Sequence, residues 1–196
     1  MTDRIGVVLL AAGGSTRMGR PKQLLPFGGR SLVRHAAEVV AASGLRPSVA
    51  LLGPHADRVA AELDGLPLTA VVNADWARGI GTSIRVGVMS ALAADADLGA
   101  VVVTLADLPA VTPELLGALA REHRAGGHAV VACRYDGTAG VPALFAASLF
   151  PELLKLPDEQ GAKRLIASAG SDVAVIEFPG GAADIDTPAD YERLRK

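Results

Sequence analysis

The stretch that decides the fold is Ile5-Gly-Val-Val-Leu-Leu-Ala-Ala-Gly-Gly-Ser-Thr-Arg-Met-Gly-Arg-Pro-Lys22. Its first part, Ile5–Ala11, is an uninterrupted apolar run of the kind that forms a buried strand. The rest is a loop rich in small residues that carries Arg17 and Lys22 among its cations. A buried strand that leads directly into such a loop is typical of α/β proteins, whose ligands bind at the carboxyl ends of parallel strands.

Outward from this stretch, short β-branched runs alternate with longer segments rich in alanine and leucine. This alternation predicts a mostly parallel sheet with helices on both faces, in a doubly wound, Rossmann-like α/β fold that takes up residues 1–196 as a single domain. Strands are expected at 5–11, 48–52, 68–72, 99–105, 129–133 and 173–178, and helices at 31–43, 56–63, 83–94, 113–124, 148–154, 160–169 and 187–195. Residues 135–144 are the least regular and are expected to form a small hairpin or lid.

Composition narrows the function classes. Half of the 196 residues are hydrophobic, 20% are charged and the formal net charge is −2. Nothing indicates the clustered basic surface of a nucleic-acid-binding protein. The single cysteine excludes an internal disulfide framework and a multi-cysteine zinc site. Without an apolar run of about 18 residues or a signal peptide, we expect a cytoplasmic protein with no membrane segment.

The loop after the first strand has the chemistry of a phosphate-binding loop. Small residues let the backbone approach a ligand, so nucleotide contacts are expected at Leu10, Ala11, Ala12, Gly13 and Gly14. The cations of Arg17 and Lys22 suit a triphosphate and the charge that develops as pyrophosphate leaves. The alternative is a flexible turn with two solvated cations, but the length, position and residue order favour phosphate binding. The P-loop and the G-x-G-x-x-G dinucleotide pattern are both absent.

Acidic residues follow two of the predicted strands. Asp107 comes just after the apolar run 99–105, where a carboxylate would project into the ligand crevice and could bind Mg²⁺. It could equally cap a turn ahead of Pro109. Asp184 and Asp186 come before the last predicted helix, and Asp184 is expected to be structural.

A turn of small residues precedes the helix predicted at 83–94. A nucleotide base could lie against the backbone of Gly79, Gly81 and Thr82, with the Ser83 hydroxyl as a donor. The simpler alternative is that Ser83 only caps the helix. Trp76, the single tryptophan, either shields this site or is a packing residue.

Several of these segments resemble one family. The segment 10–22 resembles the first-strand loop of the MobA-like nucleotidyltransferases, which include the molybdenum-cofactor cytidylyl- and guanylyltransferases. The likeness continues through residues 73–83, 105–109, 140–145 and 184–188. It therefore runs in order through nearly the whole chain.

The resemblance implies a nucleotide-diphospho-sugar transferase-like fold and a Mg²⁺-dependent nucleotidyltransferase, with Arg17 and Lys22 as catalytic cations and Asp107 and Asp186 as metal ligands. The implied partners are a nucleoside triphosphate, a phosphorylated acceptor of the molybdopterin type, and a molybdoenzyme or its maturation chaperone. Ala12 stands where guanylyl-transferring relatives usually have glycine, which resembles the cytidylyl branch. Val141 stands where many members carry histidine, and this departure leaves the acceptor-side contacts open.

Two alternatives remain beside this interpretation. One is transfer to a sugar phosphate or polyol phosphate on the same fold, and the other is a nucleotide-binding protein without catalysis. A nicotinamide-dependent oxidoreductase is disfavoured because the dinucleotide pattern is missing. Lys163 and Arg164 could contact an anionic acceptor, or they could form a solvated helix face.

Overall fold

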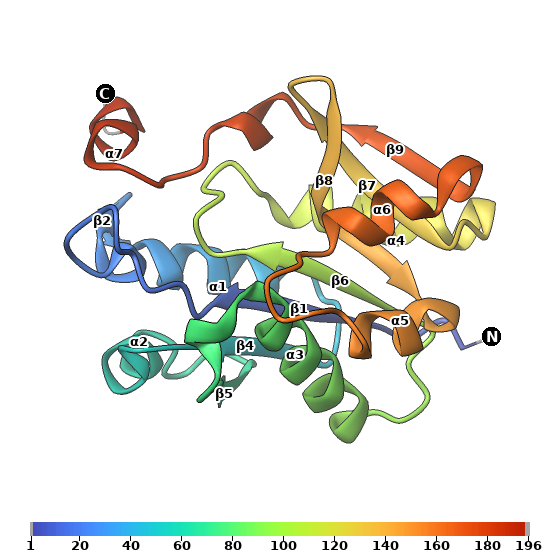
Figure 1. Ribbon diagram of the computed structural model, residues 1–196, viewed down its shortest axis with the longest axis horizontal. Coiled ribbons are helices and arrows are strands. Elements are labelled where there is room, and N and C mark those ends of the chain that lie inside the picture. The colour runs from blue at the N-terminus through green and yellow to red at the C-terminus, as the bar shows by residue number, and fades with distance from the viewer. Residues whose placement is uncertain (1, 195–196) are drawn as a thin grey trace.

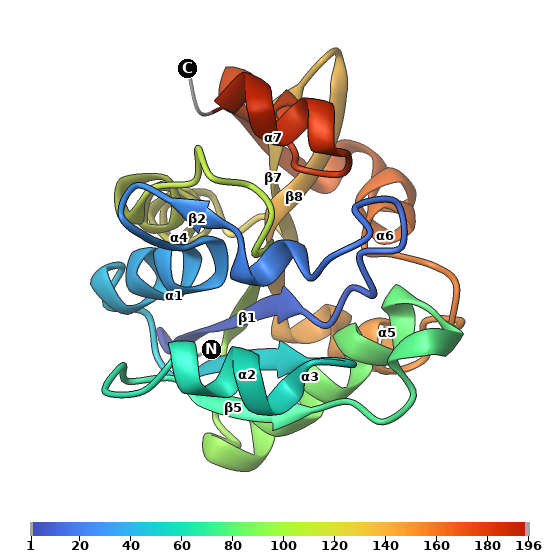
Figure 2. The same ribbon diagram turned by 90° about the vertical axis from the view of Figure 1, so that its left-hand side faces the viewer.

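The computed structural model describes residues 2–194 and consists of a central sheet between two layers of helices (Figures 1 and 2). The strands are β1 Ile5–Ala11, β4 Ser48–Leu52, β5 Thr69–Val72, β6 Ala100–Leu105, β7 Val130–Tyr135, β8 Thr138–Ala146 and β9 Val173–Glu177, with a separate small hairpin of β2 Pro26–Phe27 and β3 Arg30–Ser31. The helices are α1 Leu32–Ala42, α2 Ala56–Glu62, α3 Ile80–Ala94, α4 Pro113–Gly126, α5 Phe150–Leu154, α6 Lys163–Ser168 and α7 Pro188–Leu194.

The seven-stranded sheet has the order β5-β4-β1-β6-β8-β7-β9. Strands β4 and β6 flank β1, and both are parallel to it. The chain first winds outward from β1 to β4 and β5, and then returns across β1 to β6. The winding direction therefore reverses beside β1, which brings the loops that follow β1 and β6 together. The predicted α/β class is confirmed.

Side-chain alternation along β1 builds two cores. Val7 and Leu9 pack with α1, α2 and α4, whereas Val8 and Leu10 pack on the other face with α3, α5 and α6. Because both faces are covered, every residue of β1 is buried. This explains why the strand reads as a continuous apolar run rather than an alternating one.

Side chains cap the N-termini of three helices. The hydroxyls of Ser31 and Thr112 accept hydrogen bonds from the backbone N–H groups three residues ahead, at the starts of α1 and α4. At the start of α7, Thr187 and Asp190 bond each other's backbone N–H group, as in a capping box. The last helix was predicted to reach Arg195, which lies outside the described residues.

The segment 135–144 forms a hairpin, one of the two predicted forms, rather than a lid, because the chain turns at Asp136 and Gly137 from β7 into the antiparallel strand β8. Most of it belongs to β8, which lies inside the sheet antiparallel to both β6 and β7. Pro142 falls at the β-bulge where the pairing of β7 and β8 shifts register, which is where a strand tolerates proline. The segment 135–144 looks like a loop in sequence because it contains the turn residues Asp136 and Gly137 together with Pro142.

Two further predictions differ from the structure. Helix α3 begins at Ile80, three residues earlier than expected, and Gly79 rather than Ser83 is its N-cap residue. The hairpin of β2 and β3 was not predicted, because two-residue strands leave no periodic pattern. No helix in the described part of the chain has the length and apolar character needed to cross a membrane.

Candidate active site

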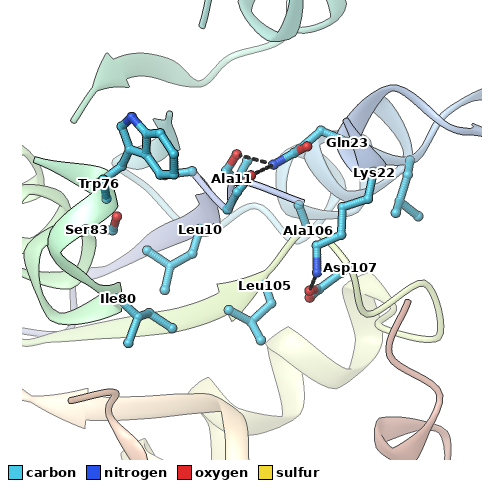
Figure 3. Close-up of a pocket in the computed structure, with 15 residues that line it drawn as sticks. Leu10, Ala11, Lys22, Gln23, Trp76, Ile80, Ser83, Leu105, Ala106 and Asp107 are labelled. Carbon is cyan, nitrogen blue, oxygen red and sulfur yellow. Dashed lines mark hydrogen bonds and ion pairs between the residues drawn. The ribbon is translucent and has the colours of Figure 1, made fainter. Parts of the chain in front are cut away.

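A cavity of about 290 Å³ lies at the carboxyl ends of β1 and β6 (Figure 3). This volume is close to the lower end of the range for small-molecule sites, about 300–1,000 Å³. The cavity is lined by Leu10, Ala11, Ala12, Gly13, Gly14, Lys22, Gln23, Leu32, Trp76, Ala77, Ile80, Ser83, Leu105, Ala106 and Asp107. The predicted loop residues 10–14 therefore share one cavity with Lys22 and Asp107.

The loop between β1 and β2 is held in shape by Gln23, a residue that the sequence analysis did not single out. Its buried side-chain amide donates to the carbonyl oxygens of Ala11 and Gly13, at 3.0 and 2.7 Å. The Ser15 hydroxyl donates to the amide oxygen of Gln23 and accepts from the Lys22 backbone N–H. The loop thus closes on itself around one amide and one hydroxyl, and this arrangement fixes the position of Lys22.

Four predicted charged residues form one network, and two of them, Lys22 and Asp107, line the cavity. The Lys22 ammonium donates to a carboxylate oxygen of Asp107 and lies 3.0 Å from Oδ1 of Asp186. Arg17 contacts the other oxygen of Asp186 at 2.8 Å. Because Asp107 follows β6 and Asp186 precedes α7, the network joins three distant parts of the chain. Lys22 is largely buried, whereas Arg17 is mostly exposed.

The carboxylates set the protonation states in this network. Burial acts to lower the pKa of the Lys22 ammonium, but the charges and hydrogen bonds of Asp107 and Asp186 outweigh burial and raise the pKa above its usual value. Lys22 is therefore a fixed cation at neutral pH. Burial, together with the charges of Asp186 and Asp107, raises the pKa of the neighbouring Asp184. Negative charge is thus concentrated around a single ammonium.

Asp107 and Asp186 fit a site for a divalent cation. Oδ1 of Asp107 is buried and has no hydrogen-bond partner among the described residues, so it carries an unused acceptor. Carboxylate oxygens are the protein ligands that Mg²⁺ prefers, with phosphate oxygens and water completing its octahedron. No group of three or more potential ligands occurs in residues 2–194, so a cation here would depend on a ligand's phosphates.

The opposite side of the cavity is apolar. The indole of Trp76 packs against Gly14 so closely that a Cβ at Gly14 would lie 2.7 Å from the ring. Ser83 and Ile80, both in α3, complete this wall. Asn73, a second residue that was not singled out, is buried and donates from its amide to the hydroxyls of Thr82 and Ser83, at 2.8 and 2.9 Å.

Only Ser83 of the predicted base-binding turn lines the cavity. Gly79 and Gly81 face the backbone of residues 157–160, where a Cβ on either glycine would collide with carbonyl oxygens. The Gly81 N–H donates to the Asp158 carbonyl oxygen at 2.8 Å. The two glycines thus permit close packing of this segment against α3. Base contact by this turn stays a prediction.

Comparison with known proteins places these features in a family. Residues 7–173 match the model of the MobA-like NTP transferase domain, and the chain belongs to this family. It is 30% identical over 201 residues to the purine catabolism protein PucB of Bacillus subtilis, covering 96% of this chain and 95% of PucB. It is also 40% identical over 120 residues to nicotine blue oxidoreductase of Paenarthrobacter nicotinovorans, but that match spans 61% of this chain and only 57% of the relative.

Solved structures show the same fold. The chain superposes on Rv0371c from Mycobacterium tuberculosis H37Rv with a TM-score of 0.83 and 30% identity, covering 98% of this chain and 99% of that one. A second structure of Rv0371c is a complex with manganese and has a TM-score of 0.78 with 29% identity, covering 97% of each chain. The predicted family resemblance is therefore confirmed.

Proposed function

We propose that this protein is a divalent-metal-dependent nucleotidyltransferase that transfers CMP from CTP to a phosphorylated acceptor of the molybdopterin type, with Mg²⁺ as its metal. The observation that carries the proposal is that Lys22 and Asp107 line one cavity with residues 10–14 of the first loop, and that the Lys22 ammonium also contacts Asp186. Membership of the MobA-like family supports it.

The nucleoside part of the substrate fits the apolar side of the cavity, between Trp76, Ile80 and Ser83. The backbone of residues 11–14 would follow the ribose and phosphates, and Lys22 would contact the triphosphate. Arg17, exposed at the rim, would hold the outer phosphates. These placements leave the Asp107 carboxylate beside the α-phosphate.

In the reaction, a phosphate oxygen of the acceptor attacks the α-phosphorus of CTP in line with the leaving pyrophosphate. Lys22 and Arg17 hold the phosphates in position and offset the charge that develops on them. Asp107 and Asp186 would hold Mg²⁺, which supplies charge neutralisation at the reacting phosphates. The protein's share of catalysis is positioning and electrostatic stabilisation, with no covalent intermediate on a side chain.

CTP is favoured over GTP because Ala12 stands where relatives that transfer a guanylyl group usually have glycine, which resembles the cytidylyl branch. Ala12 is buried and is one of the residues that line the cavity. The product would be a dinucleotide form of the cofactor, for delivery to a molybdoenzyme or its maturation chaperone.

The test is incubation of the purified protein with Mg²⁺, each of the four nucleoside triphosphates, and molybdenum-loaded molybdopterin or polyol phosphates as acceptors, with measurement of pyrophosphate release. Release that needs both CTP and the molybdopterin acceptor supports the proposal. A parallel arm follows NADH and NADPH oxidation, since one relative is named an oxidoreductase. Cofactor oxidation without pyrophosphate release would contradict the proposal.

A further inference from the structure

Gln23 is a polar residue that is buried in the lining of the candidate active site. Its Nε2 donates to the carbonyl oxygens of Ala11 and Gly13, at 3.0 and 2.7 Å (Figure 3), and its Oε1 accepts from the Ser15 hydroxyl at 3.2 Å. Because a carbonyl oxygen can only accept, the nitrogen of the amide must face the loop, and the orientation of the amide is fixed. Both amide protons of Gln23 are therefore committed to the backbone of the first loop.

These two hydrogen bonds decide which way the peptide groups of the loop face. In a trans peptide the C=O of one residue and the N–H of the next point in opposite directions, and the peptide bonds of residues 11–14 are trans. Since two carbonyls are held toward the Gln23 amide, the N–H groups of Ala12 and Gly14 point away from it. Neither of these N–H groups donates a hydrogen bond within residues 2–194. They are therefore available to a ligand.

The alternation along β1 turns the Ala12 N–H toward the cavity. Even-numbered residues of β1 direct their backbone groups toward β6, as the hydrogen bond from the Ala106 N–H to the Leu10 carbonyl shows. Continued past the end of the strand, this alternation directs the Ala12 N–H toward the cavity wall at the end of β6. The Ala12 carbonyl lies against Gly53, where a Cβ would come within 2.3 Å of its oxygen. Gly53 is not part of the cavity lining, so this carbonyl faces protein as well.

The loop needs a fixed donor to keep this polarity. Gly13 and Gly14 have no Cβ, so the peptide group between them can turn over at little cost. A turned peptide would point the Gly13 carbonyl oxygen toward the ligand, and its partial negative charge would repel a phosphate oxygen. The side-chain cations of Arg17 and Lys22 attract anions but make no hydrogen bond to these carbonyls. The two donors of the Gln23 amide are what hold them.

We infer that Gln23 is a positioning residue that makes the first loop a site for anions, by holding two loop carbonyls so that the N–H groups of Ala12 and Gly14 face the phosphates. The inference rests on the proposed function, because the anion concerned is the triphosphate of the nucleotide. Gln23 acts through the backbone, whereas Lys22 would contact the triphosphate directly.

The test compares ligands that differ in their phosphates alone. The affinities of cytidine, CMP and CTP are measured by isothermal titration for the parent, Gln23→Met and Gln23→Glu, with ligand-observed NMR for weak binding. Methionine has a similar length but no donor, and glutamate keeps the shape but replaces the donor with a second acceptor. The same two changes at Gln160, the other glutamine of the chain, are the controls, because Gln160 bonds Arg164 and lies outside the cavity lining.

We expect Gln23→Met to weaken CTP binding about tenfold or more, because the loop carbonyls lose their donors. CMP binding should fall less, and cytidine binding should not change, since the nucleoside lies on the apolar side of the cavity. Gln23→Glu should weaken CTP binding further at neutral pH, because the carboxylate repels both the loop carbonyls and the phosphates. Neither change at Gln160 should alter the affinity for CTP.

Acid should partly rescue Gln23→Glu. Once its carboxyl is protonated, the O–H can donate to one loop carbonyl, so Gln23→Glu should then bind CTP more tightly than Gln23→Met at the same pH. A carboxylate that acted by its charge alone would only bring the two variants level. Lys22, Asp107 and Asp186, the ionisable groups beside this loop, are common to both variants. The comparison at one pH therefore cancels their protonation and that of CTP.

A further comparison separates Gln23 from Lys22, whose backbone N–H donates to the Ser15 hydroxyl. Gln23→Met is introduced into the parent and into Lys22→Met, and we expect it to weaken CTP binding in both. If Gln23 served only to place Lys22, its replacement would have no effect once Lys22 is gone. Should Gln23→Met fail to fold, Gln23→Glu decides, since its CTP affinity relative to the parent must rise as the pH falls while its cytidine affinity stays constant.

Equal losses for cytidine and CTP would show a general structural role and overturn the inference. CTP binding that Gln23→Met leaves unchanged would also overturn it, as would an effect that disappears in Lys22→Met. The proposed function would stand after any of these results if the parent binds CTP and metal and releases pyrophosphate. A parent protein that binds CTP no more tightly than cytidine would instead contradict the proposed function itself.

Discussion

The ammonium of Lys22 lies 3.0 Å from the carboxylate of Asp186, although 164 positions separate the two residues in sequence. The same ammonium also donates to Asp107. One side chain of the first loop therefore occupies the space between the two proposed metal ligands. A divalent cation that binds these carboxylates has to displace the ammonium, and the released Lys22 can then turn to the triphosphate.

This relationship predicts that metal and nucleotide bind cooperatively. Lys22→Met should tighten Mn²⁺ binding to the nucleotide-free protein and weaken CTP binding. It should also reduce the factor by which bound CTP raises the Mn²⁺ affinity and bound Mn²⁺ raises the CTP affinity. The Mn²⁺ affinity is measured by electron paramagnetic resonance and the CTP affinity by Trp76 fluorescence. Arg20→Met is the matched control, since Arg20 lies over the Tyr191 ring and not on the carboxylates. An unchanged Mn²⁺ affinity in Lys22→Met would show that the ammonium does not compete with the metal.

A second prediction concerns Asp107 as the main metal ligand. Asp107→Ala should abolish turnover and Mn²⁺ binding, because it removes the carboxylate with the unused acceptor. The thermal unfolding temperature should stay near that of the parent, because the Lys22 ammonium keeps its contact with Asp186. Asp184→Ala is the control, since Asp184 is a nearby carboxylate expected to be structural. Pyrophosphate release within a few-fold of the parent in Asp107→Ala would rule out this role.

The two cations of the first loop, Arg17 and Lys22, should stabilise the transition state. Lys22→Ala and Arg17→Ala are each expected to lower kcat/KM, since removal of one preorganised charge contact commonly costs about 2–4 kcal/mol. The smaller loss should belong to Arg17, which is mostly exposed and, among residues 2–194, forms an ion pair with Asp186 alone. If the double variant with Arg17→Ala and Lys22→Ala retains both CTP binding and turnover, the triphosphate does not bind at these two cations.

The sequence predicted those parts of the fold and site that depend on local patterns. Strands β1 and β6 are uninterrupted apolar runs, so their ends, and with them Lys22 and Asp107, could be expected in one crevice. The role of Gln23 could not, because its bonds to Ala11 and Gly13 depend on how the loop folds back. The place of the hairpin strand β8 inside the main sheet could not be predicted either, because Gly137 and Pro142 look like loop residues when their pairing partners are unknown.

The packing role of the two glycines in the turn before α3 also depends on tertiary contacts and could not be predicted from the sequence. Glycines at 79 and 81 suggest close approach of a ligand, but the structure shows that the approaching group is the backbone of residues 157–160. Sequence patterns indicate that a glycine needs space, whereas only the tertiary contacts reveal what fills it.

The N-cap of α7 should make the stability of the folded protein depend on pH in the acidic range. Hydrogen bonds from the hydroxyl and the backbone N–H of Thr187 lower the pKa of the Asp190 carboxyl to about 2, from its ordinary 3.8. A lowered folded-state pKa means that the stabilisation is present above pH 3.8 and is lost as the pH falls toward 2. Asp190→Ala should therefore lower the unfolding temperature near neutral pH. The difference in unfolding temperature between the variant and the parent should become smaller as the pH falls from 3.8 toward 2. Glu122→Ala, which removes an exposed carboxylate of α4, should show no such pH-dependent difference.

The last prediction concerns base choice and depends on Ala12. Ala12 is 6% exposed, is one of the residues that line the same cavity as Trp76 and Ser83, and stands where guanylyl-transferring relatives usually have glycine. We expect the parent to prefer CTP over GTP, because a mismatched base would leave buried polar groups unpaired at about 1–3 kcal/mol each.

Ala12→Gly removes this methyl group and should raise kcat/KM for GTP relative to CTP, measured with the same acceptor. Gly13→Ala is the complementary variant. A Cβ at Gly13 has open space, with its nearest neighbours 3.9 and 4.0 Å away on Gln23 and Lys22, so this change should leave the fold intact and narrow the cavity further. Its effect should be a stronger bias against the larger guanine base. Equal kcat/KM values for CTP and GTP in the parent, or a ratio that Ala12→Gly does not move, would remove Ala12 from base selection and leave the assignment of the phosphate site to Lys22 and Asp107 unaffected.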